Sequence, residues 1–288
     1  MSKGNILYRK YIFAAIAVTI TIVATGCRQD KPAQGFLNPT AAKAATAKVS
    51  TADAARAKKA PLLYEIPAKL TDRPEQIIRH KGYTTSYNSK TKTPNWVAWH
   101  LTKQHTKGSV MRMGMLFTED TAVDAPRATD KDYYNSRYDR GHMCPAGDCK
   151  WDSEAMQESF LFTNICPQNH GLNKYEWNDL EILCRDWARK YGSVDIVCGP
   201  LYDGVGEQKM IGRNRVWVPE KFFKVVLCRH GEPKAIGFIY NNVGKKQPMQ
   251  DAVRSVDEIE MLTGIDFFPA LDDKTENLIE AESDLTEW

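Results

Sequence analysis

The chain has 288 residues, of which 42% are hydrophobic and 10% aromatic, which is enough for a buried core and excludes an intrinsically disordered chain. The formal net charge of +3 is unevenly distributed: residues 1–60 carry ten basic and two acidic residues, whereas residues 271–288 carry one basic and seven acidic residues. Residues 61–270 are left with a net charge of +1, which excludes a surface that is basic all over, so any polyanion would have to be bound by a local cluster.

The first 26 residues have the pattern of an export signal. Three basic residues precede an apolar run over residues 11–24 that is too short to span a bilayer comfortably. The run leads into ATGC, ending at Cys27, which resembles the cleavage box of bacterial lipoproteins. We therefore expect residues 1–26 to be a lipoprotein signal peptide and Cys27 to be lipidated, which would anchor the exported chain to a bacterial envelope membrane, in the periplasm or at the cell surface. An ordinary cleaved signal and an uncleaved anchor are the alternatives.

Residues 27–60 are rich in Ala, Lys and Thr and contain almost no large apolar residue, which predicts a flexible tether. The folded domain is then expected over residues 61–270. Residues 271–288 are expected to form an acidic, mobile tail.

Within the predicted domain, residues 82–101 carry alternating β-forming residues on both sides of the turn-rich segment NSKTKTPN, which predicts a hairpin. Further apolar runs predict strands, which begin at Phe160, Ser193, Arg215, Phe222 and Ala235. Helical spacing predicts one helix over residues 173–191 and another over residues 255–264, where Ser255 and Glu258 form a capping box. This order predicts an α+β fold in a single domain, with a mainly antiparallel central sheet flanked by helices.

Six cysteines remain when Cys27 is set aside. An even number in an exported protein is typical of disulfides. Free buried thiols are also consistent with the apolar runs that hold three of them. Their pairing stays open. A zinc site made by Cys144, Cys149, His142 and His170 is not expected, because the close paired spacing of structural zinc sites is missing.

His142 belongs to the tetrapeptide Asp139-Arg140-Gly141-His142, where a strand-like stretch reaches a turn. Its imidazole can accept a proton from water near neutral pH, because the unperturbed pKa is about 6.5. The glycine beside it permits another backbone or a substrate to approach closely. Taken alone, such a histidine is more often a hydrogen-bonded core residue.

Asn173, Glu181 and Arg185 project from one broad side of the predicted helix. Asn173 and Glu181 are about 12 Å apart along a regular helix axis, so both can serve one hydrated cation only through bridging waters. Mg²⁺ suits such a site, since it keeps several waters and takes few protein oxygen ligands; Mn²⁺ or another divalent cation is the alternative. The simpler interpretation is a surface ion pair between Glu181 and Arg185.

Residues 138–185 resemble the active-site region of the DNA/RNA non-specific endonucleases, the ββα-metal family. The resemblance is carried by DRGH, TNICPQN and LNKYEWNDLE in this order, and it extends from TPNWVAWHLT to SVDEIEMLTGIDFF, over nearly all of the predicted domain. It implies a ββα-metal motif in the active site, cleavage of DNA and RNA without sequence preference, and Mg²⁺ as the cofactor.

The resemblance also implies a role for each site residue. His142 would be the general base, and Asn173 would be the direct protein ligand of Mg²⁺. Arg140 would contact the scissile phosphate, Glu181 would hold metal-bound water, and Arg185 would stabilise charge in the transition state. Asp139 and Asn164 would support these residues.

One position departs from the family pattern: Pro94 stands where a basic residue commonly precedes Asn95 and Trp96, and Lys92 is the candidate substitute.

Attack by water needs no ribose 2′-hydroxyl, so both DNA and RNA are expected substrates, with 5′-phosphate products. A catalytically weak, nucleic-acid-binding surface lipoprotein of the same fold and a phosphodiesterase of small nucleotides are the alternatives. A homodimer is left open.

Overall fold

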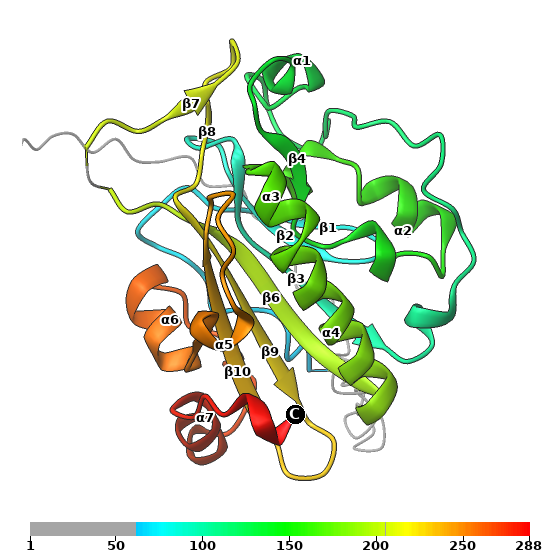
Figure 1. Ribbon diagram of the computed structural model, residues 1–288, viewed down its shortest axis with the longest axis vertical. Coiled ribbons are helices and arrows are strands. Elements are labelled where there is room, and N and C mark those ends of the chain that lie inside the picture. The colour runs from blue at the N-terminus through cyan, green and yellow to red at the C-terminus, as the bar shows by residue number, and fades with distance from the viewer. Residues whose placement is uncertain (1–61, 205) are drawn as a thin grey trace, which may run out of the picture. The chain divides into compact units, whose positions relative to one another are not determined.

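The computed structural model describes residues 62–204 and 206–288 (Figure 1). The predicted signal peptide, the lipidation site Cys27 and the tether lie outside these residues. Within the described part, no helix combines the length and apolar character needed to cross a bilayer.

The strands of the described residues fall into one large sheet and two small ones. They are β1 (Gln76–Arg79), β2 (Thr84–Asn88), β3 (Thr93–Thr102), β4 (Asp139–His142), β5 (Ile165–Gln168), β6 (Ser193–Leu201), β7 (Met210–Ile211), β8 (Val216–Trp217), β9 (Lys221–Cys228), β10 (Lys234–Asn241) and β11 (Val253–Arg254). The α-helices are α1 (Asp130–Tyr133), α2 (Ser153–Glu158), α3 (His170–Lys174), α4 (Glu176–Tyr191), α5 (Met249–Ala252), α6 (Val256–Thr263) and α7 (Asp273–Glu280).

The large sheet has seven strands in the order β1-β2-β3-β6-β9-β10-β11, and every neighbouring pair is antiparallel. The predicted hairpin is present as β2 and β3, because the turn-rich segment between them reverses the chain. The α+β fold with a mainly antiparallel sheet is confirmed.

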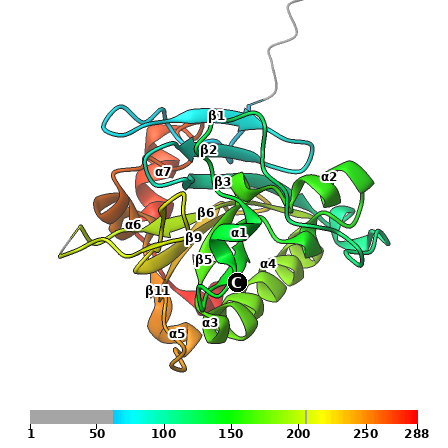
Figure 2. The same cartoon turned by 90° about the horizontal axis from the view of Figure 1, so that it is seen from above.

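Helices cover both faces of this sheet, because its central strands are apolar on both sides. Along β3, Val97 and Trp99 pack on the face that α4 covers, whereas Trp96 and Ala98 pack on the face that α6 and α7 cover. Figure 2 shows α4 on one side of the sheet and α6 and α7 on the other. The central strands therefore present an apolar face on which α4 packs.

A separate two-stranded ribbon, β4 with β5, leads into α3 and α4 and makes a ββα unit. The strand predicted from Phe160 begins only at Ile165, since Phe162–Asn164 form a 3-10 turn. The buried side chain of Asn164 holds that turn through hydrogen bonds to Cys144 and Ser159. A local polar contact thus overrides the β propensity of FLFTNI.

The helix predicted over residues 173–191 is interrupted. Tyr175 has φ −114° and ψ −90°, which separates α3 from α4. Asn173 therefore lies on α3 and not on the helix that carries Glu181 and Arg185, so the spacing along one regular helix does not apply. The helix predicted from Ser255 is confirmed as α6, with its capping box and Gly264 in the left-handed conformation at φ 66°.

The acidic segment from residue 271 differs from the mobile tail that its composition predicts. Asp272 caps α7 by accepting a hydrogen bond from the Thr275 amide, and Ile279 is buried against the sheet. The Trp288 ring packs on Trp187, with ring centroids 4.4 Å apart. The chain end is held because a few apolar side chains in an otherwise polar segment find a surface to cover.

The six cysteines of the described domain are all buried and free. Only Cys144 and Cys149 have their sulfur atoms in mutual contact, at 3.8 Å. The two cysteines do not join His142 and His170 in a metal-binding group among the described residues.

Candidate active site

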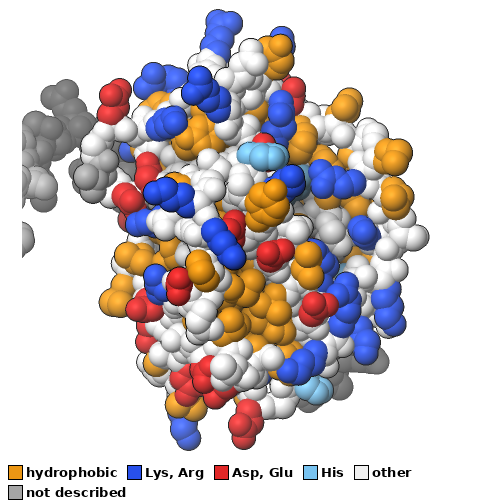
Figure 3. All heavy atoms as spheres, in the orientation of Figure 1, with side chains coloured by type: hydrophobic (Ala, Val, Ile, Leu, Met, Phe, Trp, Pro, Cys, Tyr) orange, Lys and Arg blue, Asp and Glu red, His pale blue; other side chains and the backbone are white. Residues whose placement is uncertain are grey.

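A cavity of about 320 Å³ opens between the β4–β5 ribbon and helices α3 and α4. The ionisable and amide side chains that line it are those of Arg112, Arg140, His142, Lys150, Asn173, Asn178, Glu181 and Arg185. Basic groups outnumber the single carboxylate, so the cavity is the local cluster that a nearly neutral domain needs to bind a polyanion. On the face in Figure 3, Lys and Arg side chains gather mostly in the upper and right-hand parts.

Strand β4 places His142 opposite Ile165 of β5. One residue earlier, Gly141 pairs with Cys166 and has the Gln168 side chain directly above it. A Cβ atom at Gly141 would lie 2.3 Å from Gln168 Oε1, closer than atoms can approach. The glycine in the tetrapeptide is therefore required by the neighbouring strand.

The His142 imidazole is half-buried between two aromatic rings, with centroids 5.3 Å from Phe117 and 5.0 Å from Phe160. Burial, with a smaller effect from the charge of Arg112, lowers the pKa of His142 to about 3. The ring is thus neutral at pH 7 and has one nitrogen able to accept a proton. A bound phosphate anion would raise this pKa, because a nearby negative charge favours imidazolium.

Asn173 is oriented by Asp139. Its Nδ2 donates a hydrogen bond of 2.9 Å to Asp139 Oδ2, and the same oxygen lies 2.9 Å from His170 Nδ1. Since the amide nitrogen is engaged, the Asn173 carbonyl oxygen is the atom left for a ligand. The predicted supporting residue Asp139 therefore fixes which way the amide points.

Glu181 lines the same cavity from α4 and is half-buried. Burial raises the pKa of Glu181 to about 7; Lys224 and Arg185 oppose this effect, and Asp148 adds to it. Its carboxylate accepts no hydrogen bond from the described residues, so both oxygens are free for a ligand. The surface ion pair between Glu181 and Arg185, which was the simpler alternative to a cation site, does not form among the described residues.

Arg185 pairs instead with Asp148, at 2.8 Å from Nη1 to Oδ1. Asp148 is buried and also accepts a hydrogen bond of 3.0 Å from the Trp99 indole. Gly147 lies so close to the guanidinium that a Cβ there would be 2.9 Å from Nη1. The pair holds a positive charge at the cavity wall in a fixed direction.

Arg140 reaches the cavity from β4. Its Nε donates to Asp130 Oδ1 at 2.7 Å, and its guanidinium lies over the rings of Phe117 and Tyr133 at 5.7 and 5.6 Å. The aromatic rings and the carboxylate restrict the arginine without neutralising it completely.

Beneath the cavity, the fully buried Lys224 of β9 has no hydrogen-bond partner among the described residues. Its Nζ lies over the rings of Trp177 and Trp99, at 4.5 and 5.3 Å from their centroids. It contributes a buried positive charge that acts on Glu181 and Asp148.

Asn164 lies behind the site and not in it. Its side chain forms hydrogen bonds with the backbone N–H and the backbone carbonyl of Cys144. Its backbone carbonyl accepts a hydrogen bond from the Met143 amide. Trp177 Nε1 donates to the His142 carbonyl at 3.3 Å. Through these contacts Asn164 and Trp177 position the backbone that carries His142.

Several residues that line the cavity or act on it from behind carry little signal in the sequence. Asp148 ends a 3-10 turn of three residues, and Lys150 and Arg112 lie outside helices and strands, so no periodicity marks any of the three. Lys224 alone has a recognisable signal, a single lysine inside the apolar strand FFKVVLC, which indicates a buried charge. Neither Lys92 nor Pro94 is among the described residues that line the cavity.

The donor set fits a hydrated divalent cation that prefers oxygen ligands. The Asn173 carbonyl oxygen and the Glu181 carboxylate are unengaged, and no cysteine lines the described cavity. Oxygen ligands from one or two side chains, completed by water and phosphate, are typical of Mg²⁺.

Comparison with known proteins finds a family model described as "DNA/RNA non-specific endonuclease", which matches residues 64–274. Among curated proteins, the mitochondrial nuclease EXOG of Mus musculus is 36% identical over 210 residues, which cover 67% of this chain and 57% of that protein. Mitochondrial endonuclease G of Homo sapiens is 32% identical over 207 residues, which cover 67% and 70% of the two chains. The chain thus spans less than two thirds of the length of the EXOG relatives.

Among solved structures, a crystal structure of the EndoG/EndoGI complex contains a chain that matches with a TM-score of 0.68 and 28% identity. The match covers 74% of this chain and 91% of the other.

Proposed function

Because the chain belongs to the DNA/RNA non-specific endonuclease family, we propose that it is a hydrolase that cleaves phosphodiester bonds of DNA and RNA without sequence preference. The observation that supports this most directly is the gathering of His142, Asn173, Glu181, Arg140 and Arg185 around one basic cavity on a ββα unit.

In this proposal His142 is the general base. Its neutral ring accepts a proton from water, the resulting hydroxide attacks phosphorus, and the bond from phosphorus to the 3′ oxygen breaks. The 3′ oxygen leaves with the electron pair of the broken bond and takes a proton from solvent, so the products carry a 5′ phosphate and a 3′ hydroxyl. The proton on His142 returns to solvent. No step uses a 2′-hydroxyl, so both DNA and RNA can be substrates.

The two arginines neutralise the negative charge that builds up on the phosphoryl oxygens. Arg185 is held by Asp148 and Arg140 by Asp130, so neither has to be ordered when the substrate binds.

Asn173 would hold the cation directly and Glu181 through water. When bound, Mg²⁺ would supply a compact positive charge to the phosphate oxygens and the leaving oxygen. Mn²⁺ or another divalent cation remains the alternative.

A plasmid-nicking assay with Mg²⁺ and with a chelator tests the proposal. We expect rapid loss of supercoiled DNA with Mg²⁺ and none with chelator. We expect His142→Ala to lose about 10²- to 10⁴-fold in rate, the usual contribution of a general base, with an unchanged melting temperature.

The exposed His230 provides a matched control, and His230→Ala should keep the full rate. A full rate in His142→Ala would remove the residue from the base role. If the wild-type protein binds DNA but does not nick it under any metal condition, the chain is a binding protein of this fold.

We also propose, from the sequence alone, that the protein is exported and lipid-anchored through Cys27 in a bacterial envelope membrane. Metabolic labelling with a radioactive fatty acid should mark the wild-type chain and not Cys27→Ser. Equal labelling of both would reject the lipidation site.

A further inference from the structure

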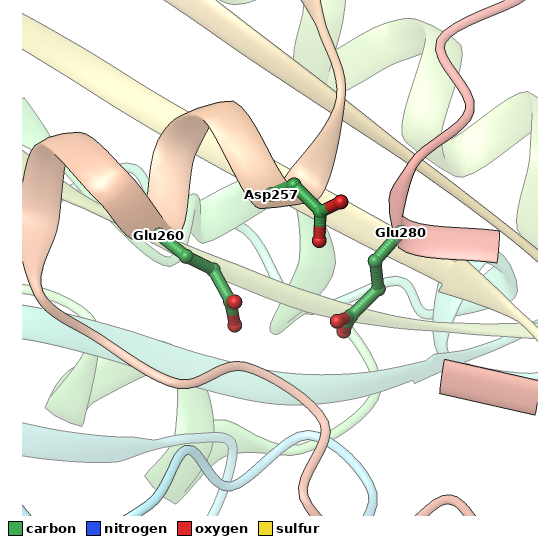
Figure 4. Close-up of side chains that lie close together, drawn as sticks. All are labelled: Asp257, Glu260 and Glu280. Carbon is green, nitrogen blue, oxygen red and sulfur yellow. The ribbon is translucent and has the colours of Figure 1, made fainter. Parts of the chain in front are cut away.

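Three carboxylates from α6 and α7 point toward one another on the face of the sheet opposite α4 (Figure 4). Asp257 and Glu260 come from α6, and Glu280 comes from the last turn of α7. One oxygen of each lies within 4.8 Å of the corresponding oxygens of the other two. The packing of α7 beside α6 thus brings together three acidic side chains from two separate segments of the chain.

Glu280 distinguishes this group from an ordinary acidic surface. Only 4% of the residue is exposed, and its Oε1 is buried without a hydrogen-bond partner among the described residues. Buried polar atoms in folded proteins are nearly always paired, so this oxygen requires a proton, an ordered water or a cation.

The surroundings of the group are acidic. Burial raises the pKa of Glu280 to about 9, and the neighbouring charges that act on it most strongly are those of Glu260, Glu276, Asp257 and Asp266, which raise it further. Burial likewise raises the pKa of Glu260 to about 7, opposed by the Phe267 amide that donates to its Oε1 at 2.6 Å. Carboxylates this close repel one another unless positive charge enters.

We propose that Asp257, Glu260 and Glu280 form a second cation site, distinct from the active site, which binds Ca²⁺ and ties α7 to α6. Three oxygen ligands without nitrogen or sulfur favour a hard cation. Ca²⁺ binds oxygen at about 2.3–2.6 Å, so two of its ligands can lie up to about 5 Å apart, and oxygens that all lie within 4.8 Å of one another can therefore bind one such ion. Mg²⁺, at about 2.0–2.1 Å, demands a tighter octahedron.

The expected consequence is attachment of the C-terminal segment. Helix α7 has eight residues and buries Ile279 and Glu280, so few apolar contacts hold it. A cation shared between the two helices would stabilise the docked state by mass action.

The test uses the full chain carrying Asn173→Ala, which removes the proposed direct ligand of the active-site metal. Isothermal titration with CaCl₂ after chelation should show one Ca²⁺ per chain. Glu280→Gln, which keeps the side-chain size, should weaken Ca²⁺ binding by about tenfold or more. Asp257→Asn, at an exposed position where folding is not at risk, should weaken it in the same direction.

Glu282→Gln is the matched control, since Glu282 is an exposed acid close to the end of α7 and outside the group. It should change the Ca²⁺ affinity by less than about twofold, as expected for a screened surface charge. Hydrogen exchange of the amides of residues 273–280 should slow with Ca²⁺ in the control and not in Glu280→Gln.

Equal Ca²⁺ affinity in Glu280→Gln and Glu282→Gln would overturn the proposal, as would an absence of Ca²⁺ binding in both. Neither readout depends on nuclease activity, so failure of this proposal and failure of the proposed function are distinguishable.

Discussion

Glu181 and Glu280 are carboxylates on opposite faces of one sheet, and burial acts on both in the same direction. It raises the pKa of Glu181 to about 7 and that of Glu280 to about 9. Around Glu181, the charges of Lys224 and Arg185 oppose the effect of burial, whereas around Glu280 the strongest neighbouring charges are acids. The sign of the neighbouring charges thus decides how readily a buried carboxylate ionises, and therefore what it can bind.

The two regions should separate cleanly in their effects on rate and on stability. Glu181→Gln removes the charge that we propose holds water on the metal, so we expect plasmid nicking with Mg²⁺ to slow by about 10- to 100-fold. Glu280→Gln lies on the other face of the sheet and should keep the wild-type rate. Initial nicking rates of both variants check this, with melting temperature as the control for folding. Equal rates in the two variants would show that Glu181 has no special role in cleavage.

Lys224 should be the charge that distinguishes the two carboxylates. Lys224→Met removes a buried cation, so we expect the pKa of Glu181 to rise by about one unit, which corresponds to about 1.4 kcal/mol. In a plot of nicking rate against pH at low Mg²⁺, the acidic limb, where the rate falls as the pH is lowered, should then move to higher pH by the same amount.

Lys221→Met provides a matched control on the same strand, since Lys221 pairs with Asp203 at 3.0 Å, outside the cavity lining. It should leave the limb unchanged. An unmoved limb in a well-folded Lys224→Met protein would mean that Lys224 does not act on Glu181.

A separate effect is expected in the pH dependence of stability. The folded-state pKa of Glu280 is about 9, above the usual 4.5, so the folded protein retains a proton that the unfolded chain has lost. Stability from this group is therefore present at low pH and is lost as pH rises from about 4.5 through 9. In chelator, the urea midpoint of the wild-type protein should fall between pH 6 and pH 9 by more than that of Glu280→Gln.

Ca²⁺ should flatten this dependence in the wild-type protein, because the cation replaces the proton. Glu260, whose pKa is raised to about 7, contributes with the same sign, so a smaller slope should remain in Glu280→Gln. Identical slopes in the two proteins would show that Glu280 does not carry the dependence.

Much of the fold was predictable because its signals are local. The hairpin follows from turn residues between alternating strands, and α6 follows from Ser255, Glu258 and Gly264 within ten residues. The interruption at Tyr175 was not predictable, since no glycine or proline stands at residues 173–177 to mark it. The docking of residues 271–288 depends on contacts with Trp187 and the sheet that composition does not indicate.

For the active site, the sequence by itself determined the chemical inventory: an imidazole, a carboxamide, a carboxylate and two guanidinium groups within 46 residues, in an order that resembles one family. The partners of these groups follow from the folded chain and are not visible in the sequence. Arg185 pairs with Asp148 and not with Glu181, and Lys224 enters the site from a strand that lies 39 residues further along the chain. The acids of α6 and α7 meet for the same reason: local signals specify helices and strands, whereas the charges that set a pKa or bind a cation act through space.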